Sequence, residues 1–460
     1  MFDRRQFAIG GMASLAFGGA ARAALVQPTY RNEAPGLGAL VADPARYFDL
    51  PAGFSYAVVS SFGEAMEDGY AVPDNFDGMG CFPLGGSKVA LVRNHELKPE
   101  DRESGPTRGL ARLEQRLKGE PHFGLDKQGL VLPGSTSTIV YNLGSGRRER
   151  QYLSLAGTAV NCAGGETPWG SWLSCEESVL DGKDVGQSHG WIFEVPAAKR
   201  GLAPAKPLTA MGRFRHEAAA IDRRTGIVYM TEDRDDGLFY RFLPNDRQKL
   251  NAGGRLQALT IDGRPGADTR NWNGQWFAEG ARVQARWIDM PGAESPADDL
   301  RERGRGMGAA IFARGEGIHP GRGEMFFTAT SGGAARHGQI MRYVPGRDEG
   351  SAAQEPGSLQ LFVESHDPSV LDYGDNLTVA PWGDLIVCED RTGSKTNHLK
   401  GVTPEGRIYT FARLHANTEL AGACFSPDGT TMFVNAYSPG KTLAITGPWP
   451  KPDTLRSERG

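Results

Sequence analysis

The stretch PWGSWLSCEE at residues 168–177 is the clearest indication of the fold. A Pro-Trp-Gly turn leads into a short run of apolar and small residues, and the run ends at two acids. The same order returns at residues 381–390 as PWGDLIVCED. Looser copies of the unit lie at residues 225–233, 323–328, 404–409 and 427–434. Because a turn followed by a short apolar run is typical of a β-strand, the repetition predicts an all-β protein.

Repeated turn–strand units without helical periodicity between them indicate a β-propeller. The 460 residues include 62 Gly and 29 Pro, so there is little room for long helices. The units are unevenly spaced, which predicts insertions of different length between the blades. Residues 107–118 are the best candidate for a helix, and residues 245–299 are expected to form a long excursion between blades. A β-sandwich or barrel is the alternative fold.

The first 23 residues have the features of an export signal. Arg4 and Arg5 precede a weakly apolar stretch at residues 7–20, and small residues at 21–23 offer a cleavage site. Paired arginines before a weakly apolar stretch indicate the twin-arginine route to the periplasm or the medium. We therefore expect residues 1–23 to be removed. Residues 24–460 would then form a single propeller domain, a monomer without a membrane anchor.

The composition and the missing motifs exclude several function classes. The net charge is −4, with 51 Lys and Arg against 55 Asp and Glu, which gives no electrostatic reason to expect a nucleic-acid partner. The sequence also lacks a G-x-S-x-G elbow, a Walker loop and an H-E-x-x-H motif. A serine hydrolase, a P-loop nucleotide hydrolase and a zinc peptidase are therefore not expected.

Carboxylates at the ends of the repeated units are the first candidates for a site. Glu176, Glu232 and Glu389 occupy equivalent places in three copies of the unit. Equivalent positions in a propeller surround one axis, so these acids are expected to converge at its centre. Carboxylates brought together repel one another unless a cation neutralises them. The alternative is that each is an ordinary strand-end acid facing water.

Further candidates combine acids with one cysteine and two arginines. His95-Glu96 and His216-Glu217 repeat a His-Glu pair beside apolar runs, and Cys162 is followed by small residues that leave its approach open. Carboxylates, a thiolate and arginines together suit phosphate chemistry at metal ions. The alternatives for Cys162 are an inert buried thiol or a disulfide with Cys175.

Several of these segments together resemble the PhoX-type alkaline phosphatases. They are the twin-arginine start, residues 93–96, residues 161–177 and residues 215–233. The resemblance implies a six-bladed propeller in the periplasm or the medium. It also implies hydrolysis of small-molecule phosphate monoesters at a cluster of ferric iron and calcium ions, with a metal-bound oxide or hydroxide as nucleophile.

The resemblance also implies roles for particular residues. Cys162 would match a cysteine that bridges two irons, and Glu217 would match a metal ligand. Arg314 and Glu316 would match an Arg-Pro-Glu motif, with the arginine on phosphate and the glutamate on metal, although Gly315 stands in place of the proline.

Three further positions complete the predicted site. Glu96 and Asp390 are expected to bind metal, and Arg391 is expected to bind phosphate. We predict that Glu96, Cys162, Glu217 and Glu316 meet in one pocket, although they lie far apart in the sequence.

Two other functions are compatible with the same residues. One is a calcium-dependent propeller hydrolase similar to a lactonase, which would need carboxylates but no cysteine. The other is a secreted propeller that binds a ligand without catalysis. Iron bound to a thiolate absorbs visible light and calcium does not, so the colour of the protein separates the first prediction from both alternatives.

Overall fold

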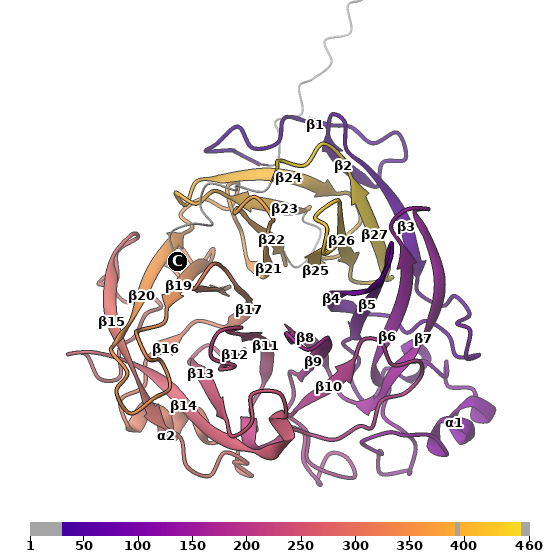
Figure 1. Cartoon of the computed structure of the whole chain (residues 1–460), viewed down its shortest axis with the longest axis horizontal. Coiled ribbons are helices and arrows are strands. Elements are labelled where there is room, and N and C mark those ends of the chain that lie inside the picture. The colour runs from indigo at the N-terminus through magenta and orange to yellow at the C-terminus, as the bar shows by residue number, and fades with distance from the viewer. Residues whose placement is uncertain (1–29, 392–395, 452–460) are drawn as a thin grey trace, which may run out of the picture.

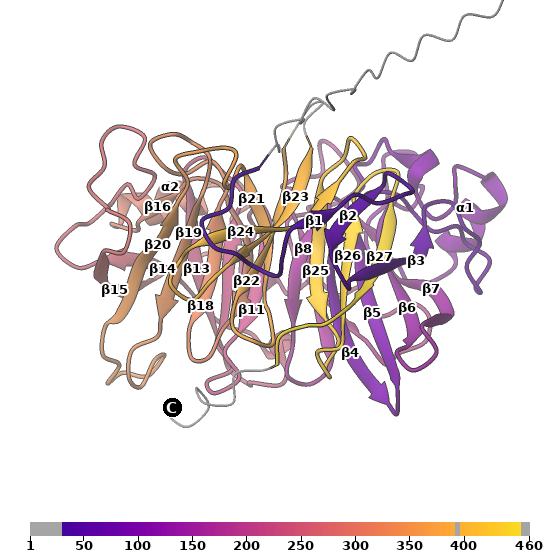
Figure 2. The ribbon, with the colours of Figure 1, turned by 90° about the horizontal axis from the view of Figure 1, so that it is seen from above.

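The computed structural model describes residues 30–391 and 396–451, so the predicted export signal lies outside the described residues. These residues form antiparallel β-sheets that surround a common axis, as Figure 1 shows from one end and Figure 2 from the side. Two short α-helices, α1 (Ala111–Lys118) and α2 (Leu300–Gly306), lie at the periphery. The predicted all-β, propeller-like architecture is therefore confirmed.

The strands of the described residues belong to five sheets. One contains β4 (Phe76–Gly85), β5 (Lys88–His95), β6 (Gly134–Asn142) and β7 (Arg147–Thr158). The next contains β8 (Asn161–Glu166), β9 (Ser171–Glu176) and β10 (Ile192–Pro196). A six-stranded sheet contains β1 (Leu40–Val41), β2 (Phe48–Pro51), β24 (Ile408–Leu414), β23 (Asn397–Val402), β22 (Leu385–Glu389) and β21 (Gly374–Val379).

The largest sheet has ten strands and consists of two meanders that share an edge. The first meander is β11 (His216–Ile221), β12 (Val228–Glu232), β13 (Gly237–Pro244) and β14 (Gly254–Ile261). The second is β17 (Gly315–Pro320), β18 (Met325–Ala329), β19 (Gln339–Val344) and β20 (Gly357–Glu364). The strand β15 (Arg282–Asp289) pairs with both β14 and β20, and the short β16 (Ile311–Phe312) pairs with β13.

The ring of sheets is closed by pairing between a strand from the N-terminal part of the chain and one from the C-terminal part. The last sheet contains β25 (Leu420–Phe425), β26 (Thr431–Ala436), β27 (Lys441–Thr446) and β3 (Ser55–Ser61). In this sheet the N-terminal β3 lies antiparallel to the C-terminal β27, with Thr442 opposite Ser60. The closure joins the first and last parts of the propeller, so the ring does not depend on packing alone.

Six strands, β4, β8, β11, β17, β21 and β25, lie nearest the axis, and each contacts the next around the circle. Glycines allow this close approach. A Cβ at Gly78 would lie 2.5 Å from Cα of Ala163, and a Cβ at Gly317 would lie 2.7 Å from Cα of Asn376. Only a residue without a side chain fits at these places, so the inner ring is packed to its limit.

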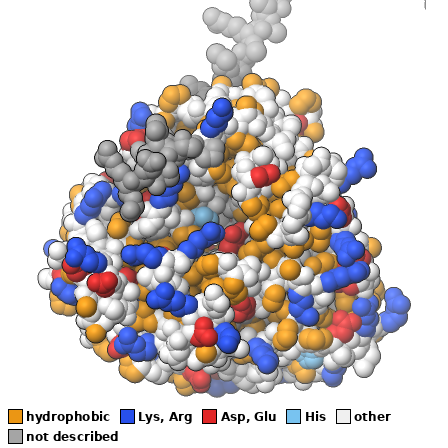
Figure 3. All heavy atoms as spheres, viewed as in Figure 1, with side chains coloured by type: hydrophobic (Ala, Val, Ile, Leu, Met, Phe, Trp, Pro, Cys, Tyr) orange, Lys and Arg blue, Asp and Glu red, His pale blue; other side chains and the backbone are white. Residues whose placement is uncertain are grey.

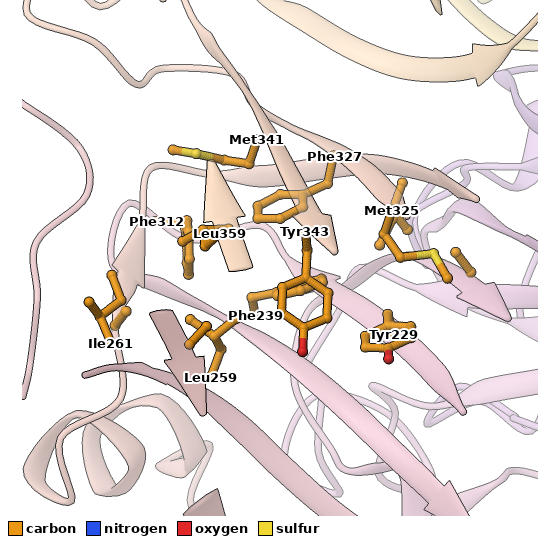
Figure 4. Packing of buried hydrophobic residues seen from close by; sticks show 14 of the residues in the cluster. Tyr229, Phe239, Leu259, Ile261, Phe312, Met325, Phe327, Met341, Tyr343 and Leu359 are labelled. Atoms are coloured by element: carbon orange, nitrogen blue, oxygen red, sulfur yellow. The ribbon is translucent and has the colours of Figure 1, made fainter. Parts of the chain in front are cut away.

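Most cores lie between neighbouring sheets, whereas the largest one, of which Figure 4 shows a part, lies mainly between the two meanders of the ten-stranded sheet. In it the rings of Phe239 and Phe327 stack with their centroids 4.3 Å apart, which joins β13 to β18. Tyr229 and Tyr343 border this pair, also fully buried. Because burying one such side chain contributes about 1.5–3 kcal/mol, these aromatic contacts hold the two meanders of the ten-stranded sheet together.

Two local predictions can be compared with the structure. The helix predicted at residues 107–118 is present as α1, which begins four residues later, at Ala111. The excursion predicted at residues 245–299 was partly wrong, because this segment contributes β14 and β15 to the sheet. The strand β14 buries the apolar residues Leu256, Ala258 and Leu259, a strand signal that the many glycines and arginines of the segment obscured. Neither helix of the described residues is long and apolar enough to cross a membrane.

Candidate metal centre

Each of the six inner strands carries a β-bulge near its start, at an equivalent place. A bulge sets two residues of one strand against a single residue of its partner and redirects a side chain. The first residues of the six bulges are Asp77, Cys162, Glu217, Glu316, Asp375 and Gly422. Five of the six strands therefore bring an acid or a thiol to the same level on the axis.

The four acids and one thiol among these bulge residues, together with two acids that directly follow neighbouring strands, form three overlapping groups. Within each group the potential ligand atoms lie within 4.8 Å of one another. The groups are Asp77–Glu96–Cys162, Cys162–Glu177–Glu217 and Glu217–Glu316–Asp375. Cys162 belongs to two groups and so does Glu217, so the seven side chains form one continuous cluster. We call these seven residues the axial cluster.

The structure thus brings together Glu96, Cys162, Glu217 and Glu316, the four residues predicted to meet. The other three members of the axial cluster, Asp77, Glu177 and Asp375, were not among the predicted site residues. A signal for two of them exists in the sequence. Asp77-Gly78 and Asp375-Asn376 repeat the order of a ligand-type residue followed by a small or amide residue, as in Cys162-Ala163.

The predicted convergence of Glu176, Glu232 and Glu389 was wrong. Each is fully buried and accepts hydrogen bonds from its own part of the fold. The partner of Glu176 is Nδ1 of His189 at 2.7 Å, and the partner of Glu389 is Nδ1 of His398 at 2.7 Å. Glu232 accepts hydrogen bonds from the backbone N–H of residue 238 and from the hydroxyl of residue 240.

The reason for this error is the two-residue period of a β-strand. Successive side chains point to opposite sides, so a shift of one position exchanges the two faces. The next residues along the chain, Glu177, Asp233 and Asp390, are the ones that approach the axis. Glu177 joins the axial cluster, and Asp233 and Asp390 lie close enough to raise the pKa of its carboxyls.

Burial dominates the electrostatics of the axial cluster. Removal from water raises the pKa of Glu217 and Glu316 well above the usual value, and repulsion from neighbouring acids raises both further. Burial likewise raises the pKa of Glu96 to about 7 and that of Asp375 to about 8. The thiol of Cys162 also has a raised pKa, through burial and the nearby carboxylates. A group of acids with these shifts strongly favours positive charge among them.

The hydrogen bonding of the axial cluster fits bound cations. Oδ1 of Asp77 and both carboxylate oxygens of Glu217 are buried and have no hydrogen-bond partner among the described residues. Leaving such atoms unpaired is costly unless something else binds them. Carboxylate oxygens suit calcium and ferric ions, and a thiolate suits a transition metal. The residues present therefore fit a cluster of several cations.

Arg314 and Arg391, the two arginines predicted to bind phosphate, are placed differently. Arg314 contacts the axial cluster: its Nη2 donates to Oε1 of Glu316 at 2.7 Å, and its Nε donates to Oδ1 of Asp233 at 2.8 Å. Arg391 instead donates from Nε to Oδ2 of Asp372 at 2.8 Å. The structure therefore brings Arg314, but not Arg391, to the ligand groups.

All five cysteines are free, so the alternative of a Cys162–Cys175 disulfide does not apply. Sγ of Cys162 lies 3.5 Å from Oδ2 of Asp77, within the axial cluster. Cys175 lies in an apolar core with Leu173 and Ile192. Cys162 on β8 thus lies among carboxylates, whereas Cys175 on the paired strand β9 lies among apolar side chains.

The fold and the site together define a class: propellers with carboxylates and one thiol gathered on the axis. The family model of the alkaline phosphatase PhoX matches residues 36–440. The chain therefore belongs to the PhoX family of alkaline phosphatases and is a phosphoric-ester hydrolase. No curated protein is significantly similar to it in sequence.

One solved structure supports the fold. The chain is similar to Pseudomonas fluorescens PhoX in complex with vanadate, a transition state analogue, with a TM-score of 0.66 and 20% identity. The alignment covers 87% of this chain and 96% of that chain. A gluconolactonase from Xanthomonas campestris aligns with a TM-score of 0.36 and 11% identity, over 87% of this chain and 97% of that chain.

Proposed function

We propose that this protein is an exported, metal-dependent phosphatase that hydrolyses small-molecule phosphate monoesters at ferric and calcium ions on the propeller axis. One observation carries the proposal: a single thiol, Cys162, lies among six carboxylates, four of them buried and two half-buried, in a chain of the alkaline phosphatase PhoX family. The twin-arginine start supports export to the periplasm or the medium. If the two meanders of the ten-stranded sheet are counted as separate blades, the propeller has six blades.

The seven residues of the axial cluster would divide between two kinds of ion. The two groups that share Cys162 contain a thiol and suit iron. The group Glu217–Glu316–Asp375 contains oxygen donors alone and suits calcium. When bound, such ions would polarise the phosphoryl group and supply an activated water-derived nucleophile, so no serine or histidine nucleophile is required.

Arg314 is the residue we propose to bind the phosphoryl oxygens. Asp233 and Glu316 fix its guanidinium through Nε and Nη2, while Nη1 has no hydrogen bond among the described residues and can donate to a phosphate. The backbone φ of Arg314 is 54°, in the left-handed region that a long side chain rarely adopts. Such strain is characteristic of functional positions, because the surrounding structure must hold it. A phosphate contact for Arg391 stays a prediction.

Replacement of Cys162 by serine tests the proposal. Cys162→Ser nearly keeps the size and shape of the side chain but replaces a thiolate by a poor hydroxyl ligand. We expect the variant to fold and to lose iron, visible absorption and phosphomonoesterase activity together. Elemental analysis, an absorption spectrum and hydrolysis of p-nitrophenyl phosphate measure the three. Cys175→Ser is the matched control in the same hairpin and is expected to keep most of all three.

The outcomes separate this proposal from its alternatives. If Cys162→Ser retains full iron content and full activity, the thiolate does not hold the metal and the iron proposal fails. If the wild-type protein contains calcium but no iron and remains active, the calcium-dependent propeller hydrolase is the better interpretation. If it binds metal but hydrolyses no phosphate monoester, the proposed substrate class is wrong.

A further inference from the structure

A cavity of about 120 Å³ lies on the axis, further along the inner strands than the axial cluster. Part of its wall is the second residue of each bulge: Gly78, Ala163, Ala218, Gly317, Asn376 and Ala423. The first residues of five of these bulges belong to the axial cluster. The cavity and the axial cluster are therefore separated only by the backbone of the bulges, and none of the seven cluster residues lines the cavity.

An acid, an arginine and a histidine of neighbouring strands line this cavity, beside the smaller polar side chains of Asn376 and Thr378. Glu166 is at the end of β8, Arg223 follows the end of β11, and His319 is near the end of β17. Figure 3 shows acidic, basic and histidine side chains gathered near the middle of the face toward the viewer. The rest of the wall is mostly apolar or backbone, with Trp172 and Leu377 as its larger side chains.

The two charged groups of the cavity do not neutralise each other directly. The described residues show no ion pair between Glu166 and Arg223. Oε1 of Glu166 accepts a hydrogen bond from the backbone N–H of Cys81 at 2.8 Å, and no other hydrogen bond to this carboxyl is present among the described residues. The side chain of Arg223 has no hydrogen bond or ion pair in the same part of the chain, and it is exposed.

The surroundings of these groups favour a partner for each charge. Burial raises the pKa of Glu166 to about 7, and the charge of Arg223 lowers it only in part. Burial lowers the pKa of His319 to about 4, so this ring is neutral at pH 7 and adds no third charge. A carboxylate with so little compensation would gain from a cationic partner inside the cavity, and the unpaired guanidinium would gain from an anionic one.

We propose that this axial cavity binds a small zwitterion of amino-acid size, with its ammonium group on Glu166 and its carboxylate on Arg223. The size of such a ligand agrees with the volume of the cavity. A cavity of about 150 Å³ holds benzene, so this cavity of 120 Å³ holds about five or six non-hydrogen atoms. L-Alanine has six such atoms. The site is distinct from the axial cluster, and binding there does not require the proposed metals or the phosphatase reaction.

Calorimetric titration of the metal-loaded full-length protein tests this proposal. We expect L-alanine to bind with a Kd of about 1 mM, a value consistent with so few contact atoms. Ethylamine and propionate each carry one of the two charges on a similar carbon skeleton. Each is expected to bind at least tenfold more weakly than L-alanine, because only a zwitterion pairs with both side chains.

Variants show whether binding occurs at this place. Glu166→Gln keeps an acceptor for the N–H of Cys81 but removes the charge, and Arg223→Gln changes an exposed side chain. Each is expected to weaken L-alanine binding at least tenfold. Arg224→Gln is the matched control in the same turn, since Arg224 is exposed and does not line the cavity. It is expected to bind L-alanine normally.

Several results would overturn the zwitterion site. Absence of heat up to about 50 mM L-alanine would show that the cavity holds water alone. Equal affinity for ethylamine or for propionate would show a site for a single charge. Unchanged binding by both Glu166→Gln and Arg223→Gln would place the ligand elsewhere. Hydrolysis of p-nitrophenyl phosphate by the same samples is a separate readout, so a failure here is distinguishable from a failure of the proposed function.

Discussion

Gly78→Ala is expected to disturb the axial cluster although it adds only one methyl group. The new Cβ would lie 2.5 Å from Cα of Ala163 and 3.1 Å from the carbonyl oxygen of Cys162. Both atoms belong to the backbone of β8 and cannot rotate away. Ordinary contacts of this kind are nearer 3.4 Å or more, so β4 and β8 must separate by roughly 1 Å.

The size of the effect follows from this displacement. Inserting a methyl group into a tightly packed region costs about 1–3 kcal/mol of unfolding free energy. The same movement shifts Cys162 relative to Asp77, whereas a metal site tolerates about 0.2 Å in its ligand distances. We therefore expect metal affinity to fall by about 10–100-fold, as it does when groups that orient ligands are changed.

Gly182→Ala is the matched control, because a Cβ at Gly182 meets nothing within 4 Å. Both variants gain the same benefit of about 0.4–1 kcal/mol from a less flexible unfolded chain, so their difference isolates the clash. Urea unfolding of chelator-treated and metal-loaded protein, together with elemental analysis, measures stability and metal content. If Gly78→Ala matches Gly182→Ala in both, the inner strands are not packed tightly enough to fix the axial cluster, and the reasoning is refuted.

Two further predictions concern charge. Arg314→Lys removes the planar guanidinium that Asp233 and Glu316 hold, and we expect kcat/KM for p-nitrophenyl phosphate to fall about 100-fold, with Arg224→Lys unchanged; equal rates for both would exclude a phosphate contact by Arg314. Chelator-treated protein is expected to lose stability as the pH rises from about 5 to 9. The carboxyls of the axial cluster keep their protons to a higher pH when folded than in the unfolded chain, where their pKa is near 4, so a rising pH favours unfolding. Urea midpoints measured across this range check the slope, and added calcium should restore stability at high pH; a flat profile would contradict it.

The fold could be predicted from local patterns because a propeller repeats one unit. The turn at residues 168–170 and its copy at residues 381–383 each lead into the second strand of a sheet, and this regularity is visible without any long-range information. The strands β14 and β15 were missed, because their segment contains so many polar residues and turns. The pairing of β15 with both meanders also depends on contacts across about 70 residues, which no local pattern reveals.

The site could be predicted in part, and its errors have a common physical origin. Cys162 and Glu217 were found through motifs, whereas Asp77 and Asp375 are marked only by a ligand-type residue followed by a small or amide residue, an order too common to single them out. Their role follows from the bulge, which turns a side chain toward the axis and cannot be read from alternation alone. The choice of Glu176 over Glu177 was an error of one residue. It shows that a pattern can locate a strand end without fixing which side chain faces the axis.

Every residue of the axial cluster lies on one of the six inner strands or directly after the strand that pairs with an inner strand. The outer strands and the long loops contribute none, although they make up most of the chain. The protein therefore separates an inner ring of strands, which carries the site, from a periphery that contributes no residue to the axial cluster. Insertions, deletions or fused domains in the outer strands and loops would leave the chemistry at the inner ring intact. This architecture therefore allows the periphery to change without loss of the site.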